Sequence, residues 1–342
     1  MHELNGSRVL GVFPSLKPIG GVQTSGREAW QGIVRQIGGQ RTQLLCYAPG
    51  SSKGMLILGA LWNRRVADII LVWHLDLLKL MPMLKCRTSR VVLFLHGIEA
   101  WRRQDPLTKW ALRCVNLFLT NSNHTWERFL QSSAGFQNAT HQTIPLGLGT
   151  KLTQPTPAPS PKPVALMLGR LHKGEDYKGH RELIEAWPQV LQAVPRAELW
   201  IAGEGNLRRD LELLARTRGL NGQVRFWGQV PEKEKEKLIE QCRCLALPSR
   251  GEGFGLVYLE AMRMGRPCLV SNNAAGFEVV NPPEAGLAAD PDDPRQVADA
   301  MIRLLTCDRE WNQWSAQARE RYESRFTAEQ FHKRLNAALF SN

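Results

Sequence analysis

Short apolar runs alternate with longer amphipathic segments throughout the chain. Six runs in the first half predict strands, at residues 8–13, 42–48, 68–74, 90–97, 116–122 and 141–147. Five runs in the second half do the same, at residues 163–170, 197–205, 224–230, 242–249 and 266–272. Several are apolar throughout, as is typical of strands covered on both faces of a parallel sheet. Helical patterns lie between the strands, for example at residues 179–194 and 207–219.

This alternation occurs twice and predicts two doubly wound α/β domains. The boundary is the segment KLTQPTPAPSPKP, residues 151–163, whose five prolines favour an extended linker. We therefore expect one domain at residues 1–155 and a second at residues 156–326. The last stretch predicts an amphipathic helix with Thr327 as its N-cap. Ligands of such sheets bind beyond the carboxyl ends of the strands, so residues that follow strands are the candidates for chemistry.

The composition, 43% hydrophobic and 22% charged residues, is that of an ordinary globular protein. No apolar run reaches the roughly 18 residues needed to span a bilayer, and residues 1–18 lack the pattern of a secretory signal. The seven cysteines show no metal-like clustering, and Cys242 and Cys244 fall in a predicted strand as small hydrophobic residues. We therefore expect a protein of the reducing cytoplasm.

The net charge of +12 is concentrated in the first half, where residues 1–160 hold 18 Lys and Arg against 7 Asp and Glu. This asymmetry indicates an anionic partner, and a solvated basic surface without a partner is the alternative. Because no RNA-recognition, zinc-finger or helix-turn-helix signature is present, we expect no nucleic acid. Residues 77–90 mix apolar and basic side chains and are the candidate membrane-docking face. An internal helix followed by a basic loop is the other interpretation.

Two candidate groups follow strands in the first half. Gly20 and Gly21 would let the backbone approach a ligand closely, and the next helix would offer free N–H groups to an anion. A Gly-Gly turn is also common by itself. His96 could act as an acid, a base or a hydrogen-bond donor, or it could be a histidine bonded only to the backbone. For the polar side chains at residues 121–123, helix capping is the simpler interpretation.

Two cations follow the first strand of the second half. Arg170 and Lys178 suit a diphosphate, because arginine can bind it bidentately and lysine adds a point charge. Gly203 and Gly205 end the next strand in a turn that is compatible with a nearby nucleotide. Val230 follows the third strand, where exposed backbone groups could read a base edge. An ordinary loop explains that position equally well.

The stretch GEGFGLVYLE, residues 251–260, carries two carboxylates eight residues apart. Glu252 lies in a predicted turn, and the residues after it lie at the N-terminus of a predicted helix, which favours an anion. Glu260 falls among apolar residues of that helix, where a carboxylate needs a partner. The two hydroxyls of a ribose would serve, and an ion pair with Arg263 is the alternative. The acidic run at residues 290–293 predicts a capped turn rather than a metal site.

In their order along the chain these motifs resemble the retaining glycosyltransferases of family 4. The most specific motif is E-x7-E, here EGFGLVYLE, which runs on into EAM and G-x-P. GRL…YKGH, the Gly-Gly loop and HGIEAW support the same resemblance. The segment AAGFEVV at residues 274–280 differs from the Gly-Gly-x-x-Glu form of the family, with Glu278 in place of its glutamate. The resemblance covers nearly the whole chain. It implies the GT-B fold: two Rossmann-like domains facing an inter-domain cleft, with a last helix at about residues 327–342 packed back on the first domain.

The resemblance also implies roles for individual residues. Glu260 would bind the ribose of a nucleotide sugar, Glu252 would hold the transferred sugar, and His96 would contact that sugar near the reacting carbon. Arg170 and Lys178 would neutralise the diphosphate leaving group. The catalytic candidates are therefore His96, Arg170, Lys178 and Glu252. The binding set adds Gly20, Gly21, Val230, Gly253, Phe254, Gly255, Leu256 and Glu260.

The activity implied is a retaining, metal-independent hexosyl transfer from a UDP- or GDP-linked sugar to a glycan or lipid-linked acceptor. It would serve cell-surface polysaccharide or glycolipid synthesis, in the cytoplasm or on the inner face of the cytoplasmic membrane. No D-x-D motif stands at a convincing position, and no cofactor is expected besides the donor. A GT-B sugar-nucleotide epimerase and a non-catalytic nucleotide-sugar-binding protein are the alternatives.

Overall fold

The computed structural model describes residues 6–17, 20–47, 67–84, 88–155 and 158–340. The chain divides into two compact units. Unit 1 comprises residues 1–150 and 325–342, and unit 2 comprises residues 151–324. These divisions lie within a few residues of the expected boundaries at 155 and 326, and the cleft expected between the domains stays a prediction.

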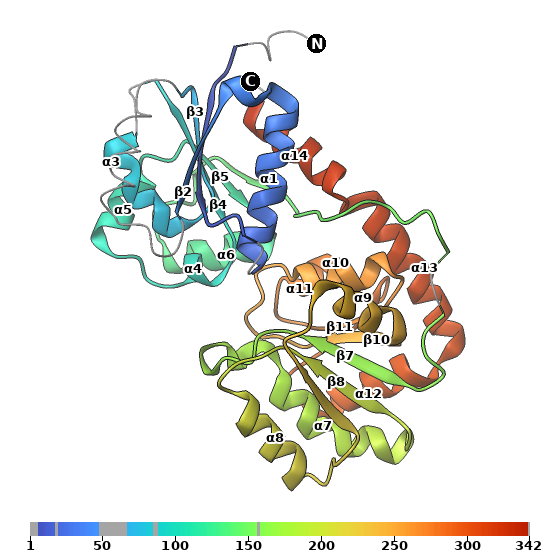
Figure 1. The fold of residues 1–342 in the computed structure, drawn as a ribbon. Helices are drawn as coiled ribbons and strands as arrows, with labels where there is room; N and C mark the ends of the chain where they lie inside the picture. The colour runs from blue at the N-terminus through green and yellow to red at the C-terminus, as the bar shows by residue number, and fades with distance from the viewer. Residues whose placement is uncertain (1–5, 18–19, 48–66, 85–87, 156–157, 341–342) are drawn as a thin grey trace. The chain divides into compact units, whose positions relative to one another are not determined.

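Unit 1 is built on a parallel six-stranded sheet in the order β2-β1-β3-β4-β5-β6. All six strands predicted in the first half are present: β1 Val9–Pro14, β2 Thr42–Tyr47, β3 Ile69–Val72, β4 Arg90–Leu95, β5 Leu117–Thr120 and β6 His141–Thr143. Helices cover both faces of this sheet (Figure 1). They are α1 Gly21–Ile37, η1 Gly39–Arg41, η2 Leu75–Leu80, α3 Met81–Leu84, α4 Ile98–Trp101, α5 Pro106–Leu112, α6 Asn123–Ser132 and α14 Ala328–Phe340.

Unit 2 contains a second parallel six-stranded sheet, in the order β12-β11-β10-β7-β8-β9. Its strands are β7 Val164–Leu168, β8 Glu198–Ala202, β9 Val224–Gly228, β10 Cys244–Leu247, β11 Cys268–Ser271 and β12 Gly286–Ala289. Its helices are η3 Lys173–Lys178, α7 His180–Ala193, α8 Arg208–Thr217, α9 Glu232–Gln241, α10 Leu256–Arg263, α11 Gly276–Val280, α12 Pro294–Thr306 and α13 Asp308–Arg325. Crossover connections leave α7, α8 and α12 on one face and α9, α10 and α11 on the other (Figure 1).

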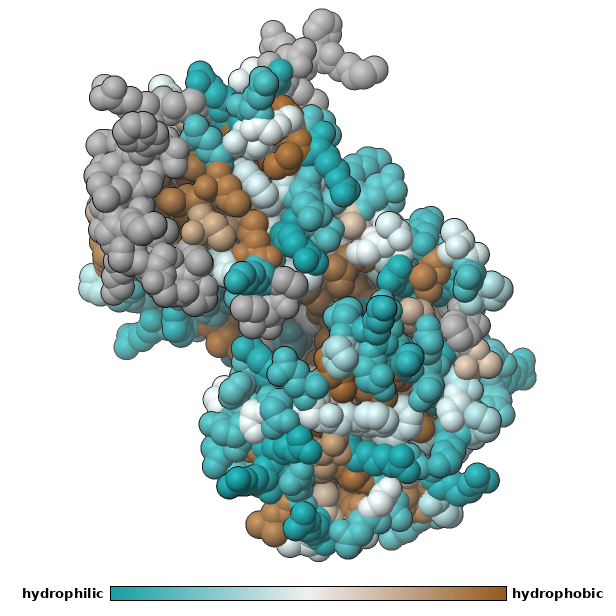
Figure 2. All heavy atoms as spheres, in the orientation of Figure 1, coloured by the Kyte–Doolittle hydropathy of each residue, from teal (hydrophilic) through white to brown (hydrophobic). Residues whose placement is uncertain are grey.

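Both sheets are covered on two sides, and this explains the apolar strand runs. Strands β3, β5, β7, β8 and β10 are buried along their whole length. Cys242 and Cys244 are fully buried free thiols, which confirms that they serve as small hydrophobic residues. The visible outer face of unit 2 is mostly hydrophilic, with hydrophobic residues scattered over it (Figure 2). The predicted pair of doubly wound α/β folds is therefore confirmed.

The helix at the end of the chain, α14, belongs to unit 1 and packs against α1 (Figure 1). Thr327 Oγ1 accepts a hydrogen bond from the backbone N–H of Gln330 at 3.3 Å, so the threonine caps this helix as predicted. Gly32 of α1 has the ring of His332 where a Cβ atom would otherwise lie, at 2.4 Å. Phe331 is fully buried. The close approach at Gly32 lets the two helices share one apolar interface.

The candidate docking segment at residues 77–90 requires a correction. Leu78, Met81 and Leu84 are no more than 1% exposed and belong to the core of unit 1. Their apolar surface is therefore committed to packing and cannot enter a membrane. This part of the chain is an internal helical segment, and residues 85–87 lie outside the described residues. Among the described helices, none has the length and apolar character to cross a membrane.

Candidate active site

The turn η3, which follows β7, brings Arg170 and Lys178 to one carboxylate. That carboxylate belongs to Glu175: one of its oxygens pairs with Arg170 Nη2 and the other lies 3.6 Å from Lys178 Nζ. The Arg170 side chain is mostly exposed, whereas those of Lys178 and Glu175 are largely covered. The two predicted cations are therefore neighbours. The carboxylate between them was not predicted, because sequence spacing does not reveal where a turn folds back on itself.

The loop after β10 packs directly on η3, and this contact brings Glu252 to the cations. The backbone N–H of Arg250 donates to the carbonyl oxygen of Tyr177 at 2.9 Å, and Ser249 Oγ donates to the same oxygen at 3.3 Å. Gly179 has a positive φ of 93°, and a Cβ atom there would lie 2.7 Å from the carbonyl oxygen of Pro248. A side chain at this glycine would therefore separate the loop from η3.

Glu252 is half-buried beside these groups. Burial raises the pKa of its carboxyl, while the positive charges of Lys178 and Arg170 oppose the rise and the negative charge of Glu175 adds to it. The charges of both predicted cations therefore act on the Glu252 carboxyl. The sequence therefore identified three residues that the fold brings together from two separate loops.

The turn from Glu252 into α10 is compact. Gly253, Phe254 and Gly255 are buried, and Gly255, with φ of 86°, is the N-cap of α10. A Cβ atom on Gly255 would lie 2.3 Å from the ring of Tyr258, so only glycine fits. The tyrosine is itself fixed by a hydrogen bond from its hydroxyl to the carbonyl oxygen of Leu247 at 2.8 Å. The aromatic ring thus sets the path of the backbone that was predicted to hold a sugar.

Glu260 lies inside α10 and is paired with a lysine of α9. Its Oε1 is 2.9 Å from Lys235 Nζ, and the same Nζ lies 2.8 Å from Glu232 Oε1. Burial raises the pKa of Glu260, and Lys235 opposes that rise. Within the described residues, Glu260 Oε2 is buried without a hydrogen-bond partner. A role for this oxygen in binding a ribose stays a prediction, and Lys235 is a partner that the sequence did not indicate.

The remaining binding candidates of unit 2 lie at neighbouring strand ends. The N–H of Gly203 donates to the carbonyl oxygen of Gly228 at 2.8 Å, and the N–H of Leu171 donates to that of Glu204 at 3.0 Å. These bonds join the turns after β7, β8 and β9 at the carboxyl edge of the sheet. Val230 is partly exposed just after this edge.

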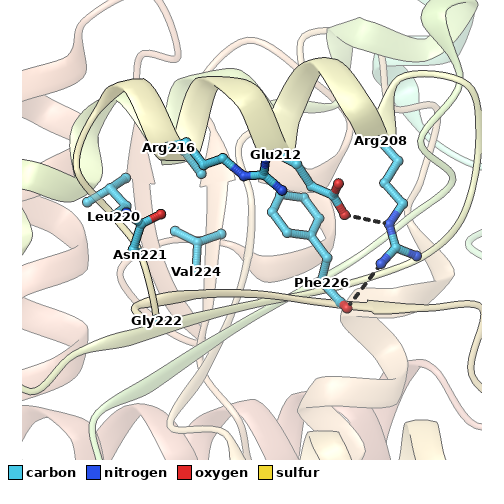
Figure 3. A pocket seen from close by; sticks show the side chains of 9 residues that line it. Arg208, Glu212, Arg216, Leu220, Asn221, Gly222, Val224 and Phe226 are labelled. Carbon is cyan, nitrogen blue, oxygen red and sulfur yellow. Dashed lines mark hydrogen bonds and ion pairs between the residues drawn. The ribbon is translucent and has the colours of Figure 1, made fainter.

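A pocket elsewhere in unit 2 contains none of the predicted site residues. It has a volume of about 260 Å³, lies between α8 and β9, and is lined mostly by charged and apolar side chains (Figure 3). Arg208 donates to Glu212 at 2.8 Å and to Glu204 at 2.7 Å. None of the lining residues belongs to the predicted donor site, so the pocket adds nothing to it.

In unit 1, the Gly-Gly loop leads into the longest of its helices. Gly20 is the N-cap of α1, and Gly21 begins the helix. Among the residues that the structure describes, no side chain caps this N-terminus. The N–H groups of the first turn are therefore in the arrangement that suits an anion. Residues 18–19 of this loop lie outside the described residues.

His96 is a buried histidine bonded to the backbone, which was the alternative to a direct role in chemistry. Its Nε2 lies 2.7 Å from the carbonyl oxygen of Trp73 and must carry the proton, because that oxygen can only accept. Burial, followed by the charge of His74, lowers the pKa of His96 to about 3. The ring is therefore neutral near pH 7, and its Nε2–H is engaged by the backbone. A sugar contact through Nδ1, which can accept a hydrogen bond, stays a prediction.

Two simpler interpretations are confirmed. Ser122 accepts a hydrogen bond from the backbone N–H of Thr125 at 3.1 Å and caps α6. Asp293 accepts from Arg295 N at 2.9 Å and from Gln296 N at 3.3 Å and caps α12, so the acidic run is a capped turn. The part of the chain that the structure describes contains no cluster of three or more His, Cys, Asp or Glu side chains placed to hold a metal.

Comparison with known families agrees with this arrangement. Residues 150–321, half of the chain and nearly all of unit 2, match the family described as Glycosyl transferases group 1. The chain belongs to the group 1 glycosyl transferases. The resemblance predicted from the sequence motifs is thereby confirmed at the level of the family, and the matched region holds Arg170, Lys178, Glu252 and Glu260.

Several group 1 relatives carry names that describe mannose transfer. A Corynebacterium glutamicum GDP-mannose-dependent monoacylated alpha-(1-6)-phosphatidylinositol monomannoside mannosyltransferase is 29% identical over 64% of this chain and 61% of its own length. A Mycobacterium tuberculosis GDP-mannose-dependent alpha-(1-6)-phosphatidylinositol monomannoside mannosyltransferase is 30% identical over 64% and 60%, respectively. The chain thus spans about 60% of the length of these curated relatives.

Solved structures share the fold over almost the entire chain. Anabaena HepE in complex with UDP-glucose has a TM-score of 0.79 at 18% identity and covers 98% of this chain and 100% of its own. Sucrose-phosphate synthase from Thermosynechococcus elongatus has a TM-score of 0.76 at 19% identity, with coverages of 97% and 98%. At these identities the likeness establishes the GT-B fold of this group 1 member and nothing further.

Proposed function

We propose that this protein transfers a hexosyl group from a UDP- or GDP-linked sugar to a glycan or lipid-linked acceptor. The proposal rests on one observation: Arg170, Lys178 and Glu252 lie close enough to interact electrostatically at the carboxyl edge of the unit 2 sheet. Two cations held there can stabilise the negative charge that develops on a departing diphosphate. Glu260, whose Oε2 has no hydrogen-bond partner in the described part of the chain, supplies an acceptor for the ribose hydroxyls.

In this mechanism the protein acts mainly by charge and position. Arg170 and Lys178 bind the diphosphate and lower the barrier to breaking its bond to the sugar, without a metal. Glu252 and the buried backbone at residues 253–255 hold the sugar at the N-terminus of α10. The anomeric configuration is retained, and the product belongs to a cell-surface polysaccharide or glycolipid. The relatives named as phosphatidylinositol mannoside mannosyltransferases favour a lipid-linked acceptor.

The test is binding followed by turnover. Thermal unfolding would be followed with UDP-, GDP- and ADP-sugars, because a ligand that binds only the native state raises Tm. We expect the matching donor to raise Tm, and addition of the acceptor to yield a glycosylated product. If donor binding leads to an epimerised sugar nucleotide without an acceptor product, the epimerase alternative holds; binding without any turnover favours a binding protein. The absence of a Tm rise with every sugar nucleotide would contradict the proposal.

The basic unit 1 and the acceptor chemistry further support docking to an anionic membrane, through α5. This helix buries Leu112 and its neighbours but turns Leu107 and Trp110, each 48% exposed, to the solvent. Lys109 and Arg113 of the same helix segment are exposed as well. An exposed surface that combines apolar and basic side chains matches the interface of a bilayer with anionic lipids.

Loss of the two apolar side chains of α5 should release the protein from vesicles. We expect the double variant Leu107→Ala, Trp110→Ala to bind phosphatidylglycerol-containing vesicles roughly tenfold more weakly, because it removes apolar area that would be buried in the interface. The measurement is co-sedimentation at low salt. The matched control is Leu213→Ala, Trp227→Ala, which removes the same two residue types, 61% and 37% exposed, from unit 2. Equal losses in both variants, or none, would contradict docking through α5.

A further inference from the structure

Glu175 occupies a position between the two cations that the proposed mechanism assigns to a diphosphate. Its carboxylate pairs with Arg170 through one oxygen and lies 3.6 Å from Lys178 Nζ through the other. The side chain is 17% exposed, so it is directed toward the site rather than into solvent. A bidentate anion thus already bridges the two cations, with no ligand needed.

The backbone supports this orientation of Glu175. The residue has φ of −123° and ψ of 23°, which interrupts the helical geometry of η3. Its neighbours in the turn pair elsewhere: Lys173 with Asp210 at 3.0 Å and Asp176 with Arg181 at 2.8 Å. Lys173, Glu175 and Asp176 therefore each have different partners. Of the two acidic residues in the turn, only Glu175 pairs with the predicted diphosphate ligands.

The pairing of Glu175 is incomplete on one side. Its Oε2 is buried and has no hydrogen-bond partner in the described part of the chain, although Lys178 lies within ion-pair distance. The Glu175 carboxylate therefore offsets the positive charge of Arg170 and Lys178, but its Oε2 forms no hydrogen bond to a described residue. A diphosphate, with more charge and more acceptor oxygens, can replace it at both cations.

We propose that Glu175 is an internal counter-anion of the diphosphate subsite, which holds Arg170 and Lys178 while no donor is bound and yields both to the diphosphate of the donor. The inference rests on the proposed function and adds a determinant of specificity to it. Because the displaced carboxylate stays near the bound anion, it weakens the binding of every phosphate compound. A compound must engage both cations to displace it, which disfavours inorganic phosphate and helps the nucleoside diphosphate product to leave.

The test removes the charge of Glu175 and keeps its shape. We expect Glu175→Gln to bind inorganic pyrophosphate about tenfold more tightly than the wild type by titration calorimetry, because a like charge beside the ligand is lost. The Ki of the nucleoside diphosphate product should fall by a similar factor, whereas Glu175→Asp, which keeps the charge, should restore the wild-type values. A purely structural role would predict the opposite, namely weaker binding as the cations lose their orientation.

The matched control is Asp176→Asn, which removes the same charge one residue away but from the pair with Arg181. Its pyrophosphate affinity should stay within twofold of the wild type. If the wild type binds pyrophosphate and Arg170→Ala weakens that binding, but Glu175→Gln binds no more tightly, the diphosphate subsite stands and the counter-anion is wrong. If neither the wild type nor Glu175→Gln binds pyrophosphate, both the subsite and this inference are wrong.

Discussion

Replacing Lys178 with alanine is expected to lower kcat/KM for the nucleotide-sugar donor by about 10²- to 10³-fold. The side chain is 15% exposed, so its charge acts on a bound diphosphate with little screening by water. The charge matters most when the bond to the sugar breaks, because the leaving group then gains negative charge. The loss should therefore fall mainly on kcat, as measured by steady-state kinetics at saturating acceptor.

Lys173→Ala is the matched control for this experiment. Lys173 lies in the same turn, but its side chain is 60% exposed and pairs with Asp210. Its removal should change kcat/KM by less than about threefold, as for an exposed ion pair. Unfolding should be compared for both variants, because a loss of native protein would imitate a loss of activity. Similar kinetics for Lys178→Ala and the wild type would show that Lys178 is not a ligand of the leaving group.

Replacing Glu260 with glutamine is expected to raise the KM for the donor by about 10- to 100-fold, the cost of hydrogen bonds to a charged group. The substitution keeps the volume of the side chain and removes the charge that two ribose hydroxyls would use. Here the loss should fall on binding, because the ribose is remote from the bond that breaks. The dissociation constant of the nucleoside diphosphate, from calorimetry, should rise by a similar factor.

Glu232→Gln separates this effect from a disturbance of Lys235. Glu232 is the other carboxylate paired with that lysine, and its side chain is 74% exposed. Both variants therefore leave Lys235 with a single acidic partner, and only Glu260→Gln removes the proposed ribose ligand. Equal changes in nucleotide affinity in the two variants would show that Glu260 serves the ion pair and not the ribose.

The fold could be predicted from the sequence because burial on both faces leaves a strong apolar signal. Every strand run that was predicted is present. The strand that was missed, β12, has the sequence GLAA, and its alanines have low strand preference and no side-chain bulk. It forms because β11 offers a parallel partner along its length, from Cys268 to Ser271. Such a strand is specified by its neighbour in the sheet and not by its own residues.

For the candidate site, the sequence could predict only residues that belong to recognisable motifs. The proximity of Arg170, Lys178 and Glu252 could be predicted, because residues that follow parallel strands converge on one edge of the sheet. The electrostatic partners were not identified: Glu175 depends on the course of a turn, and Lys235 on how α9 and α10 bring it to Glu260. The docking segment was misjudged for a related reason. An apolar residue such as Leu78 has the same pattern in a core helix as in a membrane-binding one, and only the surrounding structure distinguishes them.

The placement of α14 in unit 1 has a consequence for folding during synthesis on the ribosome. Unit 1 is made of the first and the last parts of the chain, whereas unit 2 is continuous. Until α14 has emerged from the ribosome, the surface of α1 around Gly32, which receives His332, is not covered by that helix. Synthesis proceeds at about 5–20 residues per second. The surface of α1 therefore stays without α14 for on the order of ten seconds or more, while unit 2 is synthesised. Unit 2 can complete its fold first, although it is made second.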